Sequence, residues 1–165
     1  MKAELPQYHC YERSTAQESE DAISACNRFV TGHPSDANAY LDRGLAFLNG
    51  KRFDQAEADF ARAHDLDPHS PWPLANRGIT YAWKNDSARA QRDFETVRAA
   101  DPTNAVLFRG EALLKMQRGD LDGEIDDLSA QLSRDPTDLW SLRMRADAYQ
   151  QRGDFEKARA DRAKF

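Results

Sequence analysis

Apolar and small residues between positions 37 and 70 recur with the spacing of two amphipathic helices joined by a turn. Tyr40, Gly44 and Phe47 follow one another at spacings of four and three, so they share one face of a first helix. A Gly-Lys-Arg stretch at 50–52 interrupts the pattern. The same spacing then resumes in a second helix, at Phe53, Ala56, Phe60 and Ala63. The stretch therefore predicts a helical hairpin.

The hairpin pattern returns along the chain with a constant period of 34. Gly44 is followed by Gly78, and Phe60 by Phe94, at that interval. Because the residue before a proline is pushed out of the α region, prolines at this interval mark helix ends. These prolines are Pro34, Pro68, Pro102 and Pro136. A constant period with two helices in each unit predicts a helical repeat array whose core lies between neighbouring units.

On these residues the chain resembles the tetratricopeptide repeat (TPR) family over about residues 18–165, most specifically at 37–104. The resemblance implies an all-α, right-handed solenoid of helix–turn–helix hairpins. It also implies a non-catalytic scaffold or adaptor that binds a protein or peptide in its concave groove. The expected units are a degenerate hairpin at 1–36, repeats at 37–70 and 71–104, a divergent repeat at 105–138, and a partial, capping repeat at 139–165.

Three units depart from the pattern. In the first, Ala22 and Cys26 stand one period before Ala56 and Phe60, which predicts a second-type helix over 18–31. In the unit at 105–138, the pair Arg109-Gly110 comes early by two positions, so we expect a locally shifted first helix there.

That unit also carries Glu124 in place of the small residue at the tight helix crossing. In the last unit Arg162 replaces the phenylalanine, as expected of a polar terminal cap.

Arginine stands three times at a first-helix position where TPR units typically carry leucine, and an aspartate follows each one at a constant offset of 16. The pairs are Arg43 with Asp59, Arg77 with Asp93, and Arg145 with Asp161. That offset crosses the turn, so we expect a two-pronged Arg–Asp pair within each hairpin. The alternative is a solvated charged face. Glu111 breaks the series, so Asp127 is expected to turn to Arg109 or to solvent.

The two cysteines fall on facing helices of the first hairpin in this register, because Cys10 is one period before Gly44 and Cys26 lies on the second helix. We expect a disulfide between them; the alternative is two separate buried thiols. Paired cysteines in a degenerate first unit are similar to exported bacterial TPR proteins, and a disulfide implies an oxidising compartment such as the periplasm. The absence of an apolar leader at the first Met favours the cytoplasm instead.

The TPR resemblance also implies which residues meet the ligand, because the inner side of the first helices lines the groove. The groove residues expected on this basis are Leu41, Leu45, Leu48, Trp72, Ile79, Trp83, Arg109, Leu113, Met116, Trp140 and Arg143. They predict an apolar, aromatic groove with a polar end at Arg143, suited to a peptide with hydrophobic anchors. In the alternative, Trp72 and Trp140 only seal the joints between units. The carboxylate clamp that grips chaperone tails is not expected, since Leu41, Leu45, Ala75 and Ile79 stand where it needs polar and basic residues.

Composition narrows the function further. A net charge of −5 disfavours a nucleic-acid partner. No apolar run approaches the ~18 residues of a membrane helix, so no membrane insertion is expected. The stretch from Gly44 to Lys51 differs from a phosphate loop in its glycine spacing. We expect no catalytic residue, cofactor or metal site. Two alternative roles stay open: self-association within an envelope complex, and an accessory domain of a larger protein.

Overall fold

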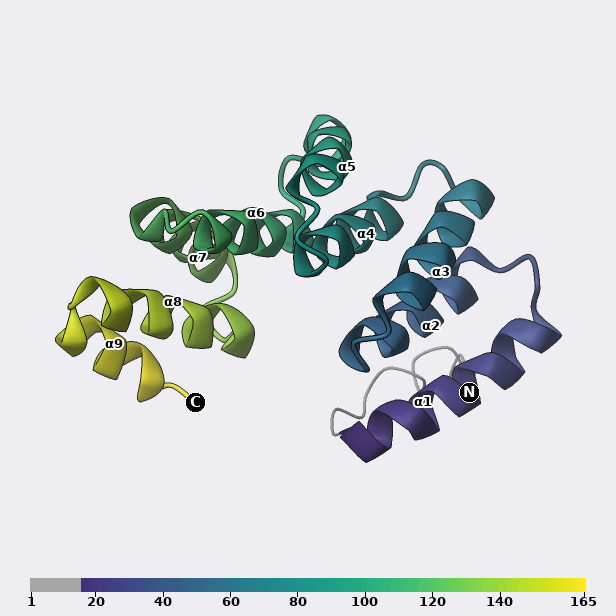
Figure 1. Ribbon diagram of the computed structural model, residues 1–165, viewed down its shortest axis with the longest axis horizontal. Coiled ribbons are helices and arrows are strands. Elements are labelled where there is room, and N and C mark those ends of the chain that lie inside the picture. The colour runs from purple at the N-terminus through teal and green to yellow at the C-terminus, as the bar shows by residue number, and fades with distance from the viewer. Residues whose placement is uncertain (1–15) are drawn as a thin grey trace, which may run out of the picture. The chain divides into compact units, whose positions relative to one another are not determined.

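The structure is a computed structural model that describes residues 16–165 of the chain, with side chains from Glu20 onward. Cys10 lies outside the described residues, so its disulfide with Cys26 stays a prediction. Every element of the described range is a helix (Figure 1). The helices are α1 (Ala16–Gly32), α2 (Ala37–Asn49), α3 (Phe53–Leu66), α4 (Pro71–Trp83), α5 (Ser87–Ala100), α6 (Ala105–Gln117), α7 (Leu121–Arg134), α8 (Leu139–Arg152) and α9 (Phe155–Arg162).

The helices keep the period of the sequence. α2, α4 and α6 begin at positions 37, 71 and 105, and α3, α5 and α7 begin at positions 53, 87 and 121. The described chain is thus an all-α solenoid of helical hairpins, as predicted. α1 confirms the second-type helix expected at 18–31. α6 begins one full period after α4, so the predicted local shift of this helix is wrong.

Each of the four hairpins from α2 to α9 turns on a residue in the left-handed backbone conformation. These residues recur with the period of the repeat and have φ values of 57, 59, 73 and 90°, at Lys51, Asn85, Gly119 and Gly153. Asparagine and glycine adopt this conformation readily, whereas a lysine does so at a cost of roughly 1–2 kcal/mol.

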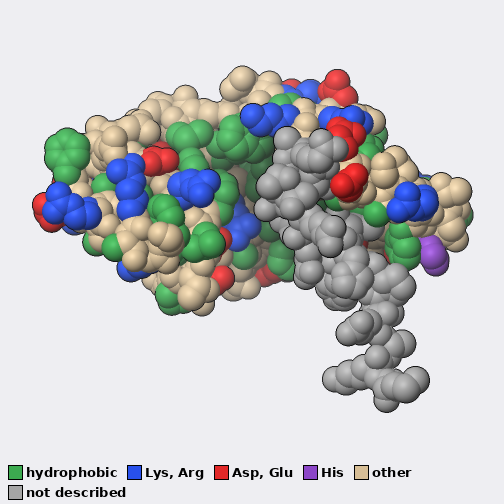
Figure 2. All heavy atoms as spheres, turned by 90° about the horizontal axis from the view of Figure 1, so that it is seen from below, with side chains coloured by type: hydrophobic (Ala, Val, Ile, Leu, Met, Phe, Trp, Pro, Cys, Tyr) green, Lys and Arg blue, Asp and Glu red, His purple; other side chains and the backbone are tan. Residues whose placement is uncertain are grey.

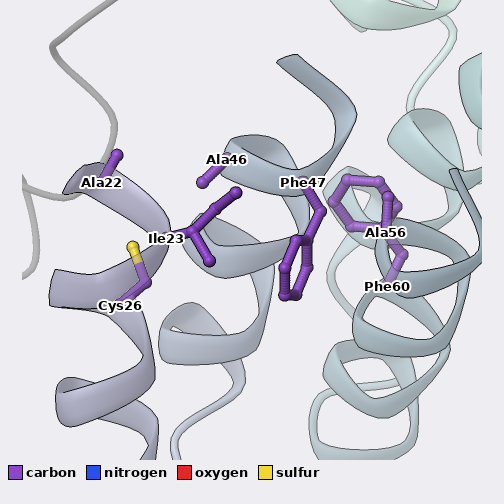
Figure 3. Packing of buried hydrophobic residues seen from close by; sticks show 7 residues of the cluster. All are labelled: Ala22, Ile23, Cys26, Ala46, Phe47, Ala56 and Phe60. Carbon is purple, nitrogen blue, oxygen red and sulfur yellow. The ribbon is translucent and has the colours of Figure 1, made fainter. Parts of the chain in front are cut away.

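The chain divides into two compact units, residues 1–96 and 97–165, with the division inside α5. In the first unit, α1, α2 and α3 share a core in which Ile23, Cys26, Phe47 and Phe60 are all at most 5 % exposed (Figure 3). In the second unit the core is aliphatic. Its fully buried side chains include Leu107, Leu113, Leu128 and Leu142.

Close helix crossings in the first unit require glycine. A Cβ atom built on Gly44 would lie 2.6 Å from the ring of Phe60, and one on Gly78 would lie 2.4 Å from the ring of Phe94. The residues one period further along the chain explain why α6 keeps its register. There Ala112 takes the glycine position and Leu128 the phenylalanine position, and both are buried. The second unit thus exchanges a Gly–Phe contact for an Ala–Leu contact at the same crossing.

This exchange gives a stability test. Gly78→Ala should lower the free energy of unfolding by about 1–3 kcal/mol, because the added methyl group overlaps the Phe94 ring. Adding Phe94→Leu should recover part of that loss, since it recreates the Ala–Leu pair of the second unit. Denaturant unfolding of both single variants and the double variant measures the coupling.

Gly32→Ala is the matched control, because no atom lies within 4 Å of the Cβ that it adds. Strictly additive effects of Gly78→Ala and Phe94→Leu would contradict the steric explanation.

Candidate functional site

Three arginines each hold an aspartate on the opposite helix of their own hairpin. Nε and Nη2 of Arg77 each donate to one carboxylate oxygen of Asp93 over 2.8 Å. The pairs Arg43–Asp59 and Arg145–Asp161 have the same two-pronged geometry, with distances of 2.7–2.8 Å. The three aspartates are only 3–7 % exposed. The predicted contact is therefore present in all three hairpins, and the alternative of a solvated face is wrong.

Two of these arginines also reach the preceding hairpin. Nη1 of Arg43 donates to Oδ1 of Asn27 on α1 over 3.2 Å, and Nη1 of Arg145 donates to Oγ of Ser129 on α7 over 2.9 Å. Each guanidinium thus ties its own second helix, through the aspartate, to the second helix of the unit before. Its hydrogen bond to the aspartate raises the pKa of each arginine above the ordinary value, so the charge persists at any physiological pH.

The hairpin of α6 and α7 keeps the aspartate, Asp127, but its cation comes from a different position of the first helix. Nζ of Lys115, one helical turn beyond Glu111, lies 2.8 Å from Asp127. The prediction that Asp127 turns to Arg109 or to solvent is therefore wrong. Arg109 instead pairs with the buried Asp138 at the start of α8, over 2.8 and 3.3 Å. Glu111, which stands where the other hairpins carry the arginine, forms an ion pair with Arg98 of α5.

The first unit carries a mostly apolar stripe on its two first helices, α2 and α4, which are in contact. We define it as the α2–α4 stripe: Asn38, Leu41, Asp42, Leu45, Leu48, Asn49, Trp72, Ala75, Asn76, Ile79, Ala82 and Trp83. The spacing between Trp72 and Trp83 equals about three helical turns, so they share one face of α4. They are 44 and 45 % exposed. The leucines of α2 and Ile79 are half-buried.

The groove residues expected in the second unit are mostly buried or in contact with other side chains of the same unit. Leu113 is 1 % exposed and belongs to the core, so the prediction that it meets a ligand is wrong. Arg109 is held by Asp138 and lies 5.8 Å from the ring of the half-buried Trp140. Arg143 lies 5.9 Å from the ring of Phe165. Met116 is half-buried.

The α2–α4 stripe contains one charged side chain, Asp42, which sequence reasoning missed. Partial burial, with the nearby charge of Asp36 as the second cause, raises the pKa of Asp42 to about 6. Asn76 occupies the equivalent position on α4 and is buried, donating to the carbonyl oxygen of Trp72 over 2.9 Å. The repeat register could have found both, because they follow Leu41 and Ala75 directly in the sequence.

Within residues 16–165, no helix is long and apolar enough to cross a membrane. The described side chains also form no group of three or more ligands suited to a metal ion. On the face shown in Figure 2, cationic and anionic side chains are interspersed with apolar ones. Many of the chain's charges are paired with one another, as between Lys84 and both Asp54 and Glu57.

The sequence matches the family model described as tetratricopeptide repeat over residues 12–71 and 76–138. Because the match covers more than half of the chain, the protein belongs to the tetratricopeptide repeat family. Members of this family are scaffolds that bind protein or peptide partners.

Curated relatives are much longer than this chain. Cellulose synthase operon protein C of Komagataeibacter sucrofermentans is 33 % identical over 78 residues, which are 47 % of this chain and 6 % of that protein. Cellulose synthase 2 operon protein C of Komagataeibacter xylinus is 29 % identical over 117 residues, 71 % of this chain and 8 % of that protein. The chain thus spans less than a tenth of the relatives that it matches.

Solved structures share the fold. A tetratricopeptide repeat protein from Parabacteroides merdae has a TM-score of 0.68 at 21 % identity, covering 88 % of this chain and 57 % of that one. PilW, a type IV pilus biogenesis factor, has a TM-score of 0.70 at 20 % identity, covering 90 and 69 %. YrrB, described as having an unusual peptide-binding site, has a TM-score of 0.55 at 16 % identity, covering 90 and 76 %.

The buried ion pairs make a specific prediction for stability. Asp93→Ala should lower the free energy of unfolding by about 3 kcal/mol, because it leaves the guanidinium of Arg77 half-buried without its carboxylate. Asp65→Ala, at an exposed position of α3, should change it by less than about 0.5 kcal/mol. Equal effects of the two substitutions in denaturant unfolding would show that the pair contributes nothing.

Proposed function

We propose that this protein is a non-catalytic adaptor that binds a peptide segment of a partner protein on the α2–α4 stripe. The exposure of Trp72 and Trp83 at the two ends of α4 is the observation that supports this most strongly. Aromatic side chains lose little conformational entropy on binding and bury a large area, which is why they dominate interface energies. Between them, Ile79 and the leucines of α2 offer half-buried apolar surface to a ligand.

The length of the stripe favours a short peptide. The helical rise of about 1.5 Å per residue places the two tryptophans about 16 Å apart. That distance matches about five residues of extended chain or about three turns of helix. Two apolar anchors at this separation would therefore engage both rings at once. The family membership and the peptide-binding site of YrrB, a structural neighbour, agree with this use of the fold.

The charge of Asp42 on the stripe suggests which kind of residue the ligand carries between its two apolar anchors. Asp42 forms no ion pair among the described residues, and burial, with the nearby charge of Asp36, raises its pKa to about 6. A lysine or arginine in the ligand would compensate it, whereas an acidic residue would be repelled. We therefore infer a peptide with apolar anchors and at least one basic residue.

The match to cellulose synthase operon protein C favours a second candidate role, a scaffold segment within a polysaccharide-synthesis assembly. Both roles use the array as a binding surface. Recovery of synthase subunits with the wild-type array, but not with a Trp72→Ala/Trp83→Ala variant, would support this second role over a free peptide adaptor.

The location of the site can be tested by photocrosslinking. A photoreactive amino acid at Leu45 or Ile79 should crosslink a partner from the native source, and one at the exposed Asp65 of α3 should not. Once the partner is known, Trp83→Ala should weaken its affinity at least tenfold, as expected for an aromatic anchor. Unchanged affinity with an intact helical spectrum would place the site elsewhere.

The pH dependence of that affinity tests Asp42. Because only the ionised carboxylate attracts a cation, binding should strengthen as pH rises from 5 to 7, through the pKa of about 6. Asp42→Asn should weaken binding at pH 7 and remove this rise. A wild-type affinity that is flat over this range, measured by calorimetry, would argue against a basic residue at this point of the ligand.

A further inference from the structure

Helix α7 buries a carboxyl group where the other second helices bury a methyl group. Glu124 is 2 % exposed, and its equivalents in the other second helices are 0–8 % exposed: Ala22, Ala56, Ala90 and Ala158. Its buried neighbours on α7 include Ile125 and Leu128. Its Oε2 atom has no hydrogen-bond partner among the described residues. An ionised carboxylate in such surroundings is strongly disfavoured unless a cation or a donor meets it.

Cations of the neighbouring helices are engaged elsewhere. Five cations on α6, α8 and α9 have other carboxylate partners, in the pairs Arg109–Asp138, Lys115–Asp127, Arg145–Asp161, Arg152–Asp122 and Arg162–Asp147. Arg143 of α8 is exposed and lies against the ring of Phe165. The charge that acts most directly on Glu124 is the like charge of Asp147 on α8. Burial first, and Asp147 second, raise the pKa of Glu124 to about 7.

We propose that Glu124 is a proton-linked latch that holds the C-terminal hairpin, α8 and α9, against α7. When Glu124 is protonated, it is a neutral group that the packed junction accepts. When it loses its proton, it becomes an unpaired buried anion beside the carboxylate of Asp147. Local separation of α8 from α7 lets water reach this anion, so ionisation favours the open hairpin.

A second polar group weakens the same junction. Gln131 stands two turns further along the buried side of α7, is 3 % exposed, and leaves its Oε1 atom without a partner among the described residues. The equivalent positions in the first two hairpins are apolar, Ala63 and Val97. The face of α7 that packs on α8 therefore buries polar groups at positions where α3 buries apolar ones. The latch acts on the element that carries Trp140 and Arg143, and it does not depend on the proposed peptide site of the first unit.

The direction of the pH effect follows from the two pKa values. In the docked hairpin the pKa is about 7, and in water it is near the ordinary 4.5. The docked form therefore binds the proton more tightly, and the opening constant rises with pH between 4.5 and about 7, then levels off. Between pH 5.5 and pH 8 the rise should be roughly thirtyfold.

Hydrogen exchange of the full chain tests the latch. Protection factors, corrected for the intrinsic pH dependence of exchange, should fall about thirtyfold for amides of residues 139–162 between pH 5.5 and pH 8. Amides of residues 37–66 in the first unit should not change. Glu124→Gln keeps the shape but cannot ionise, and Glu124→Ala restores the residue of the other repeats. Both should abolish the fall.

Asp126→Asn is the matched control, because Asp126 is exposed on the same helix and its loss should leave the fall unchanged. Constant protection of the wild-type hairpin would overturn the proposal, as would a fall that persists in Glu124→Gln. A fall that extends equally to residues 37–66 would also overturn it, because the cause would then be global unfolding.

Discussion

The bidentate pair between an arginine of a first helix and an aspartate of the following second helix fixes how each hairpin closes. A guanidinium and a carboxylate with two parallel hydrogen bonds accept one relative placement, whereas leucines facing each other tolerate several. Separating the two groups is costly, because it would leave an almost fully buried aspartate without its cation. Through Asn27 and Ser129, two of the arginines extend this constraint to the preceding hairpin. The register of these hairpins is thus held by charges as well as by apolar packing.

The hairpin of α6 and α7 shows that the aspartate is the fixed member of the pair, whereas the position of the cation can change. With glutamate at position 111, the cation comes from Lys115, a turn further along α6. The displaced Arg109 then serves a different purpose and ties α6 to the start of α8 through Asp138. Without a cation the partly buried Asp127 would lower the stability of the fold, and Lys115 is the cation of α6 that reaches it.

The two units differ in which side chains they bury and which large apolar side chains they expose. The first unit ties its buried aspartates into ion pairs and presents two tryptophans to solvent on α4. The second unit has taken Leu113 into the core and Arg109 into an ion pair, and it buries Glu124 where an alanine would suffice. Burying an ionisable group away from a cation lowers stability at neutral pH, and this cost makes the last hairpin easier to open as the pH rises.

The sequence by itself determined the repeat, the all-α class, the helix that became α1 and the three Arg–Asp pairs. Each of these depends on local spacing: apolar residues at helical intervals, prolines at a fixed period, and an offset of 16 that a helix–turn–helix geometry converts into a contact. Only the tertiary structure decided which partner Asp127 takes, that Leu113 is buried, and that α6 keeps its register with Ala112 and Leu128 at the crossing. These outcomes depend on the space between packed helices and on competition among several charges within reach, and neither can be read from spacing along one chain.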